Sequence, residues 1–347
     1  LLYAVAMIAA GALLLVFSAV LAGETVWLER RGAGRMQARI GPNRVGPQGL
    51  LQFLADALKL LAKEDIIPRN ADKMIFRLAP VVVFAGAFVG FAVIPFGYGL
   101  VVADMNVGLF LVLSLTSIEV VGVIMAGWAS NSKWAVLGSM REVAQMVSYE
   151  MPLAISALAV VVLGGSLNLT DLVVQQSGGV WNLYVVRGPF AFLAFFVFGV
   201  SMLASLKLAP IDLPEAESEL VAGFHTEYTG FRFAIFFLGE YAGMILFSLL
   251  AAILFLGGWD PGFPIALTEG WLRWAGFIVL MGKVFMLLFV MIWIRWSLPR
   301  YRVDKVMYLC YKVLLPWSIV CVVGVALQVL LASSLPWEGL SQWLMGK

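Results

Sequence analysis

Several ionisable side chains stand inside strongly apolar stretches of this sequence, where a charge is costly. Glu119, Glu150 and Glu240 lie in three separate stretches, and Lys283 lies in a fourth. Burial disfavours the charged form of a carboxyl group, so acids in such places can take up and release protons. Three of them together with a lysine predict a proton relay. The plainer alternative is a structural ion pair in which Lys283 holds one glutamate.

A second group of acids lies in a segment between two apolar stretches. Five acids fall within the sixteen residues 212–227, namely Asp212, Glu215, Glu217, Glu219 and Glu227. Glu215 and Glu219 are four residues apart, and like charges at that spacing on a helix repel, which favours uptake of a proton by one of them. We expect residues 207–230 to form an acidic loop that exchanges protons. The alternative is an ordinary solvated loop.

The composition places these acids in an integral membrane protein. Of the 347 residues, 62% are hydrophobic and 13% are charged, whereas a soluble domain has about 45–50% apolar and about 25% charged residues. Soluble enzyme folds are therefore excluded, and the net charge of +2 gives no indication of a nucleic-acid partner. One histidine and two cysteines are too few for a haem, a four-cysteine iron–sulfur cluster or a zinc site, so we expect no metal and no redox cofactor in this chain.

The apolar stretches predict an all-α membrane protein. A helix needs roughly 20 apolar residues to cross the hydrocarbon core, and its backbone must be satisfied internally. We expect a single polytopic domain over residues 1–347, with about eight spans at 1–27, 74–95, 107–129, 140–164, 188–208, 231–257, 272–296 and 308–332.

The basic residues orient these spans. Nineteen of the 23 basic residues lie in four segments on one side, 28–77, 130–141, 207–232 and 295–312. The opposite loops, 96–106, 165–186 and 258–271, have none. The positive-inside rule therefore places the basic side in the cytoplasm and both termini outside.

The first basic loop, 28–73, has a defined local structure. Residues 41–47 contain two glycines and two prolines, which predicts a fixed, turning backbone. Residues 49–64 then place apolar side chains such as Phe53 on one helical face and polar ones such as Asp56 on the other, which predicts an amphipathic helix at the membrane interface. This helix is either a surface anchor or one wall of a site for a lipid-like substrate.

Several motifs carry a resemblance to a known family. They are RIGPNRVGP at 39–47, KED at 63–65, AGWASNSK at 126–133, SYE at 148–150, DLPEAESELVAG at 212–223 and GGW at 257–259. In this order they resemble the membrane-embedded H subunit of NADH:quinone oxidoreductase, the bacterial counterpart of mitochondrial NADH dehydrogenase subunit 1 in respiratory complex I. The resemblance extends over about residues 24–312 and implies eight transmembrane helices, an interfacial helix after the first, and a place in the bacterial inner membrane.

The resemblance also implies roles for residues. Quinone, the substrate, would enter between the first span, the interfacial helix and the sixth span. The chamber residues implied are Glu29, Arg30, Arg39, Phe53, Asp56, Ala57 and Phe224. The proton path implied runs from the acidic loop toward antiporter-like subunits, through Asp212, Glu215, Glu217, Glu219, Glu227, Glu119, Glu150 and Glu240, and we add Lys283 to it.

No catalytic residue is implied in this chain. FMN and the iron–sulfur clusters would belong to partner subunits. The partners implied are the hydrophilic subunits of the quinone site, small membrane subunits, antiporter-like subunits and membrane lipid.

One segment departs from the family pattern. The family commonly has Ala-Glu-x-x-Arg-x-Pro-Phe-Asp before the acidic loop, whereas Ser205 replaces the Glu and Leu208 replaces the Arg in this sequence. Both members of a possible ion pair are lost together, so the loop geometry can be kept. This departure counts against a mechanism in which that glutamate is obligatory in this chain.

The expected function is that of a membrane subunit of a proton-pumping NADH:quinone oxidoreductase, which forms the quinone chamber and the acidic link to proton translocation. A stand-alone proton-coupled transporter is one rival, but it does not explain the Gly/Pro loop, the interfacial helix or the lack of an internal repeat. The membrane anchor of a hydrogenase-type complex and an assembly scaffold without a proton role are the others.

Overall fold

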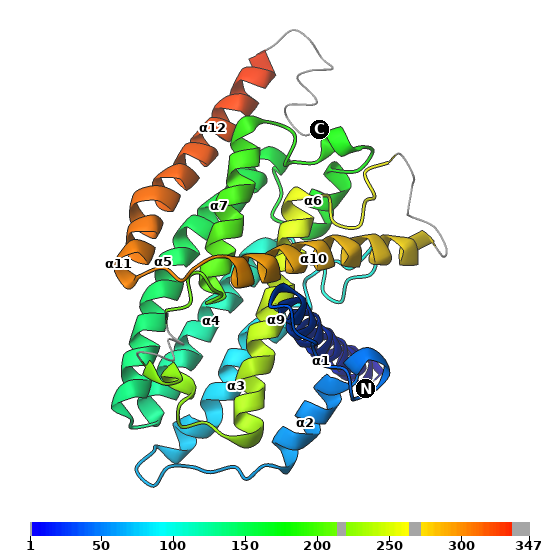
Figure 1. Cartoon of the computed structure of the whole chain (residues 1–347). Coiled ribbons are helices and arrows are strands. Elements are labelled where there is room, and N and C mark those ends of the chain that lie inside the picture. The colour runs from blue at the N-terminus through cyan, green and yellow to red at the C-terminus, as the bar shows by residue number, and fades with distance from the viewer. Residues whose placement is uncertain (1, 214–219, 264–271, 335–347) are drawn as a thin grey trace.

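The computed structural model describes residues 2–213, 220–263 and 272–334 of the chain. Its regular elements within these ranges are helices, and no strand is formed there beyond one isolated bridge between Gly97 and Leu100. Figure 1 shows long helices packed into one bundle. Helices satisfy every backbone group within the segment, as lipid requires. The predicted all-α membrane class is confirmed.

The long helices are α1 (Leu2–Met36), α3 (Lys73–Gly90), α4 (Gly108–Ala129), α5 (Lys133–Gly164), α7 (Pro189–Ser205), α9 (Gly230–Phe255), α10 (Leu272–Ser297) and α12 (Leu315–Ser334). The short elements are η1 (Pro47–Gly49), α2 (Gln52–Ala62), α6 (Leu169–Gln175), η2 (Val180–Asn182), η3 (Gly223–His225), α11 (Val303–Tyr308) and the π-helical turn η4 (Leu309–Leu314).

Seven of the described helical segments are long and apolar enough to cross a membrane, with α11, η4 and α12 counted as one. The shorter apolar helix α7 has 17 residues. An α-helix of that length extends about 26 Å, close to the hydrocarbon thickness of about 30 Å. With α7, the structure matches the eight predicted spans, and the chain is a multi-pass membrane protein.

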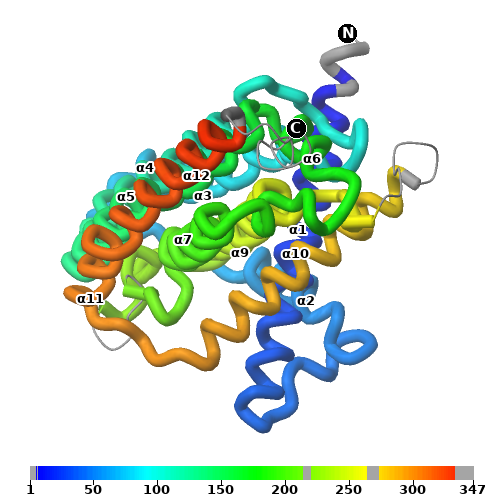
Figure 2. Tube along the Cα trace, turned by 90° about the horizontal axis from the view of Figure 1, so that it is seen from above, coloured from blue at the N-terminus to red at the C-terminus, as the bar shows by residue number. Residues whose placement is uncertain are grey.

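Helix α9 is the central helix of the bundle (Figure 2). Every residue from Tyr241 to Phe255 is buried, which is the pattern of a helix covered on all sides. It packs against α1, α2, α3, α7 and α10. The bundle therefore positions side chains of α9 toward several neighbours at once, and the two candidate sites described below both use it.

The first predicted span ends too early, because α1 continues to Met36. The charged side chains of its last turns have partners: Glu29 pairs with Arg295 of α10 at 3.0 Å, and Arg31 donates to the carbonyl of Gln48 at 3.0 Å. Charged residues thus end the apolar run without ending the helix. The prediction that residues 28–36 form a loop is wrong.

The fifth predicted span, 188–208, ends too late, since α7 stops at Ser205. Lys207 takes a left-handed backbone conformation, with φ at 57°. The N–H of Leu208 then donates back to the carbonyl of Leu203 at 3.1 Å. This turn carries the chain out of the helix and into the acidic loop.

Candidate functional site

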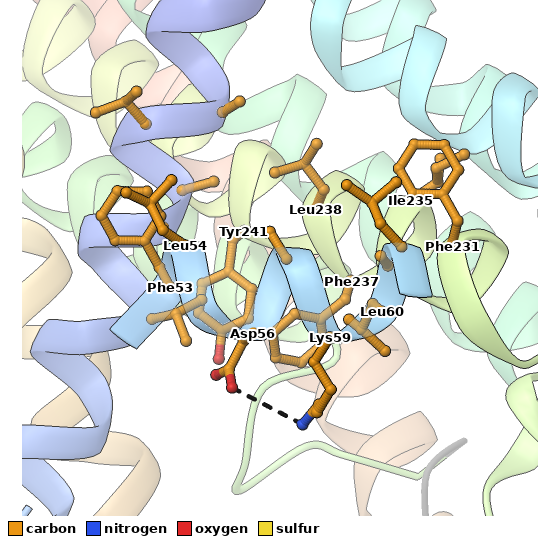
Figure 3. Close-up of a pocket in the computed structure, with 18 of the residues that line it drawn as sticks. Phe53, Leu54, Asp56, Lys59, Leu60, Phe231, Ile235, Phe237, Leu238 and Tyr241 are labelled. Atoms are coloured by element: carbon orange, nitrogen blue, oxygen red, sulfur yellow. Dashed lines mark ion pairs between the residues drawn. The ribbon is translucent and has the colours of Figure 1, made fainter. Parts of the chain in front are cut away.

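A cavity of about 570 Å³ lies between α1, α2 and α9 (Figure 3). Phe53 and Leu54 of α2 and Phe237 and Leu238 of α9 are among the side chains that line it. Gly23 of α1 leaves room for the ring of Phe53, because a Cβ built on Gly23 would lie 2.5 Å from that ring. An apolar cavity of this size can hold a small organic ligand.

The polar edge of this cavity joins α1 to α2. Arg30 of α1 donates to Asp56 of α2 at 2.5 Å, and Gln52 also donates to Asp56, at 3.2 Å. Lys59 lies 3.8 Å from the same carboxylate (Figure 3). The cavity is thus apolar over most of its walls and charged along one edge, which suits a ligand with a polar head and an apolar tail.

Helix α2 itself is only partly covered by the rest of the chain. None of its residues is buried, and Leu54, Leu58 and Leu61 are 48%, 66% and 58% exposed. An amphipathic helix with uncovered leucines is typical of the membrane interface, where lipid covers the apolar face. The helix covers Gln52–Ala62, within the range 49–64 predicted from the sequence.

The end of α2 is fixed to the start of α9. Thr229 accepts from the N–H of Ile66 at 3.2 Å and donates to the carbonyl of Glu64 at 3.3 Å. Asp65 pairs with Arg232 of α9 at 2.8 Å. These contacts hold α2 beside α9, so the cavity is part of the fold.

A buried polar group lies behind the cavity wall. Tyr241, which lines the cavity, donates to Glu29 of α1 at 2.6 Å, and Arg295 of α10 pairs with the other oxygen of Glu29 at 3.0 Å. Glu29 is 5% exposed. This contact connects the cavity to α10, and it positions Glu29 one side chain away from the cavity.

A second site gathers carboxyl groups around Lys207. The Lys207 ammonium lies 3.2 Å from the carboxylate of Glu119 on α4 and forms a closer ion pair with Glu142 on α5. All three side chains are shielded from solvent: Lys207 is 5% exposed, Glu119 is 12% exposed and Glu142 is 0% exposed. Glu240 of α9 acts electrostatically on Lys207, and Glu150 interacts with Glu119 and with the hydroxyl of Ser117.

Phe224 belongs to this second site and does not line the cavity. The Lys207 ammonium lies 5.4 Å from the centre of its ring, and Phe224 packs edge to face on Phe236 at 5.2 Å. The neighbouring Tyr228 stacks on Phe76 at 4.0 Å. Burial raises the pKa of Tyr228, so its hydroxyl stays protonated and donates to the Phe76 carbonyl at 3.3 Å.

The family is decided by comparison with known proteins. A family model described as NADH dehydrogenase matches residues 8–326. The chain belongs to this family. The H subunit of NADH-quinone oxidoreductase from Anaeromyxobacter dehalogenans is 44% identical to it, over 96% of this chain and 84% of the relative. Proteins of the same name from Chlorobaculum parvum and Chlorobium luteolum are each 47% identical, over 88% and 87% of this chain and 87% and 83% of the relatives.

The kinship inferred from the motifs is thereby confirmed, and the chain is a member of an oxidoreductase family. Of the chamber residues that the resemblance implies, the structure brings Arg30, Phe53, Asp56 and Ala57 together around the cavity. Arg39 lies apart from them in the loop after α1, where it donates to Gln37 at 2.6 Å.

The expected proton-path residues of this NADH dehydrogenase family member divide into three groups. Glu119 pairs with Lys207, Glu240 acts electrostatically on Lys207, and Glu150 interacts with Glu119. Asp212 instead faces Arg300 at 3.6 Å, and Glu227 is half-buried next to Tyr228. The expected residues Glu215, Glu217 and Glu219 lie outside the described residues.

Two members of the Lys207 site are absent from the residues predicted from the sequence. Glu142 lies near the start of the predicted fourth span, beside Arg141, and looks like the polar end of that span. The sequence does contain a signal, because Glu142, Gln145 and Tyr149 recur at helical spacing. In the structure all three side chains are fully buried. Lys207 lies in the segment that departs from the family pattern. The departures themselves are at Ser205 and Leu208, so the pattern does not single out Lys207.

Lys283 is held at the opposite end of α9 from the carboxyl groups. Its ammonium donates to the carbonyls of Leu256, Gly258 and Asp260 at 2.6, 2.9 and 2.5 Å. Sixteen residues of helix separate Glu240 from Leu256, which is about 24 Å along the axis. These contacts assign Lys283 the task of capping the carbonyl groups at the end of α9, and its place in the proton path stays a prediction.

We expect Lys283→Met to lower the stability of the subunit by about 2–4 kcal/mol, because it removes three hydrogen bonds from a charged donor and leaves buried carbonyls without it. The thermal unfolding of the assembled membrane complex measures this. Lys305→Met is the control, since Lys305 is exposed. Equal thermal stability of the two variants would contradict the capping role.

Proposed function

We propose that this chain is the membrane-embedded H subunit of a proton-pumping NADH:quinone oxidoreductase, that the cavity between α1, α2 and α9 admits quinone from the bilayer, and that the carboxyl groups around Lys207 couple quinone reduction to proton translocation. One observation carries the proposal. Adjacent residues of α9 serve the two sites: Phe237 lines the cavity, and Phe236 packs on Phe224, whose ring centre lies 5.4 Å from the Lys207 ammonium. A change at one site can therefore reach the other within one helix.

The cavity matches the chemistry of a quinone. The isoprenoid tail of such a molecule is apolar and would lie along Phe53, Phe237 and Leu238, beside the uncovered leucines of α2. Its polar head would pass the charged edge formed by Arg30 and Asp56. Burial of apolar surface supplies the driving force for the tail, and the charged edge orients the head.

Reduction of a quinone to a quinol takes up two electrons and two protons. The electrons would come from iron–sulfur clusters of partner subunits, which receive them from FMN. The chain's own part is electrostatic. Proton uptake near Tyr241 and Glu29 would change the electrostatic field at Glu240, the adjacent residue of α9, and through it at Lys207. The carboxyl groups would respond by taking up or releasing protons.

The membrane orientation and the partners belong to the same proposal. The basic loops would face the cytoplasm of a bacterium and both termini the periplasm. The hydrophilic subunits of the quinone site would dock on the side of α2 and η3. Small membrane subunits and antiporter-like subunits would receive protons or conformational change from the side of α4 and α5, where Glu119 and Glu142 lie.

A quinone analogue with a photoreactive group on its tail tests the cavity. In the assembled complex, we expect illumination to label peptides of α2 and of the first turns of α9, because Phe53 and Phe237 line the cavity. An excess of the natural quinone should suppress the labelling. Labelling confined to other helices, or labelling that the natural quinone does not reduce, would contradict the assignment.

A further inference from the structure

Lys207 joins three parts of the structure through one side chain. Its ammonium contacts Glu119 of α4 at 3.2 Å and, more closely, Glu142 of α5. It also lies 5.4 Å from the ring centre of Phe224 in η3. Lys207 thus contacts α4, α5 and the short helix η3, which follows the acidic segment. Lys207 itself precedes the acidic segment and lies two residues after the end of α7.

The fold accepts two unfavourable features at this residue. The side chain is 5% exposed, and a buried ammonium is costly unless it is paired. The backbone has φ at 57°, a region that residues other than glycine rarely adopt. Residues that combine strain with a buried charge cluster at functional sites.

The turn that carries Lys207 is also held by contacts that do not involve its charge. The side-chain amide of Gln145 on α5 donates to the carbonyls of Ala204 and Ile211, both at 2.7 Å. These two bonds fix both ends of the turn to α5. The charge of Lys207 is therefore available for a purpose other than holding the loop.

The departure of this segment from the family pattern has a structural counterpart. The family pattern has an arginine where Leu208 stands in this chain, and Leu208 is fully buried without a charge. The neighbouring Lys207 carries a cation that faces two carboxylates. The turn of this chain thus holds a cation although Leu208 is uncharged.

The net charge of Lys207, Glu119 and Glu142 determines how many protons this set can take up. Two carboxylates and one ammonium carry one net negative charge, so the set can accept one proton and become neutral. Without the ammonium, two buried carboxylates would repel each other, and one would already hold a proton. Glu240, which also acts on Lys207, would add to that repulsion.

We propose that Lys207 is a positioning residue that keeps Glu119 and Glu142 ready to accept one proton in each turnover. The inference rests on the proposed function and adds to it the group that sets the proton capacity of the relay. The proton received by either carboxylate leaves toward the next carboxyl group, and Lys207 keeps its own proton throughout.

Four variants of the assembled complex, reconstituted in lipid vesicles, test the charge count by the number of protons pumped per electron. Lys207→Arg keeps the net charge, and so does the double variant Lys207→Met with Glu142→Gln, which leaves Glu119 as the single charge. We expect Lys207→Arg to pump near the unmodified ratio, and the double variant to pump clearly more than either single variant, because Glu119 can still accept the proton. Lys207→Met alone and Glu142→Gln alone change the net charge, and we expect each to pump at less than about half of that ratio.

A merely structural ion pair gives a different pattern, because the single variants would then lower assembly or thermal stability, and the complexes that do assemble would pump at the unmodified ratio. An unmodified ratio in both single variants overturns the inference, as does a double variant that pumps no better than Lys207→Met. If Lys207→Met does not assemble, Glu142→Gln and the double variant decide between the inference and a structural ion pair. Glu150→Gln distinguishes a failure of this inference from a failure of the proposed function. If Glu150→Gln stops pumping but the four variants do not follow the net charge as expected, only the role of Lys207 is wrong. If Glu150→Gln also pumps normally, the proposed relay is wrong.

Discussion

Gly23→Phe lowers the quinone reductase activity of the assembled complex by about tenfold or more, because a large ring cannot be added to a closely packed wall without displacing its neighbours. Even a Cβ at Gly23 would lie 2.5 Å from the ring of Phe53. A phenyl ring there would displace Phe53 or fill the cavity between α1, α2 and α9. The rate of NADH oxidation with a long-tailed quinone measures the effect.

Gly11→Phe is the matched control for this prediction. It makes the same substitution in the same helix, at a position where no atom lies within 4 Å of an added Cβ. We expect it to keep the unmodified rate. NADH oxidation with an artificial acceptor that takes electrons before the quinone should be unchanged in both variants. If Gly23→Phe reduces long-tailed quinone at the unmodified rate, the cavity is not the route of the substrate.

Glu150→Gln reduces the number of protons pumped per electron to below about half, because a neutral amide cannot pass on a proton as a carboxyl group does. The variant is suited to this test for a structural reason. Glu150 interacts with Ser117 and Glu119, so its replacement by an amide of the same shape does not take a counter-charge away from Lys207. We therefore expect the complex to assemble normally.

Asp304→Asn is the control for the loss of one carboxylate. Asp304 pairs with Arg302 at 3.3 Å on the exposed part of α11, and its side chain is 77% exposed. An exposed pair of this kind contributes little to stability, and the partner of Asp304 is Arg302 and not Lys207. We expect this variant to pump at the unmodified ratio. A fall in pumping by both variants to the same extent would point to a general effect of charge loss.

Much of the fold could be predicted because the bilayer imposes simple requirements. Each apolar stretch of about 20 residues had to be a helix, and the helices lie close to the predicted ranges. Their ends could not be predicted from hydropathy. Helix α1 continues past its apolar run since Glu29 finds Arg295 on a distant helix, and α7 ends early since Lys207 adopts a left-handed conformation.

The candidate sites were predictable in part for similar reasons. The periodicity of α2 indicated that Phe53 and Ala57 share a face, and both line the cavity. The resemblance to the quinone-reducing family led to the proposal that this cavity admits quinone. Which buried carboxyl groups meet depends on helix packing, which no local pattern contains. The sequence therefore suggested Lys283 as a member of the relay, whereas the structure has Lys207 and Glu142 beside Glu119.

Family membership also decides between the rivals considered for this chain. A stand-alone transporter would have been expected to match transporters, whereas the family model and the relatives belong to NADH dehydrogenase. The relatives reported above are named as H subunits of NADH-quinone oxidoreductase. The ion pair between Asp65 and Arg232 fixes α2 to α9. A helix that served only as a surface anchor would not require this contact.

The central claim is that quinone access and proton transfer are separate sites joined by α9, and one measurement tests it most directly. Protons pumped per electron are compared in vesicles for the complex with Gly23→Phe, with Glu150→Gln and without substitution. We expect Gly23→Phe to slow both processes in proportion and so to keep the ratio, and Glu150→Gln to lower the ratio below about half. An unmodified ratio in Glu150→Gln, with electron transfer intact, would contradict the claim.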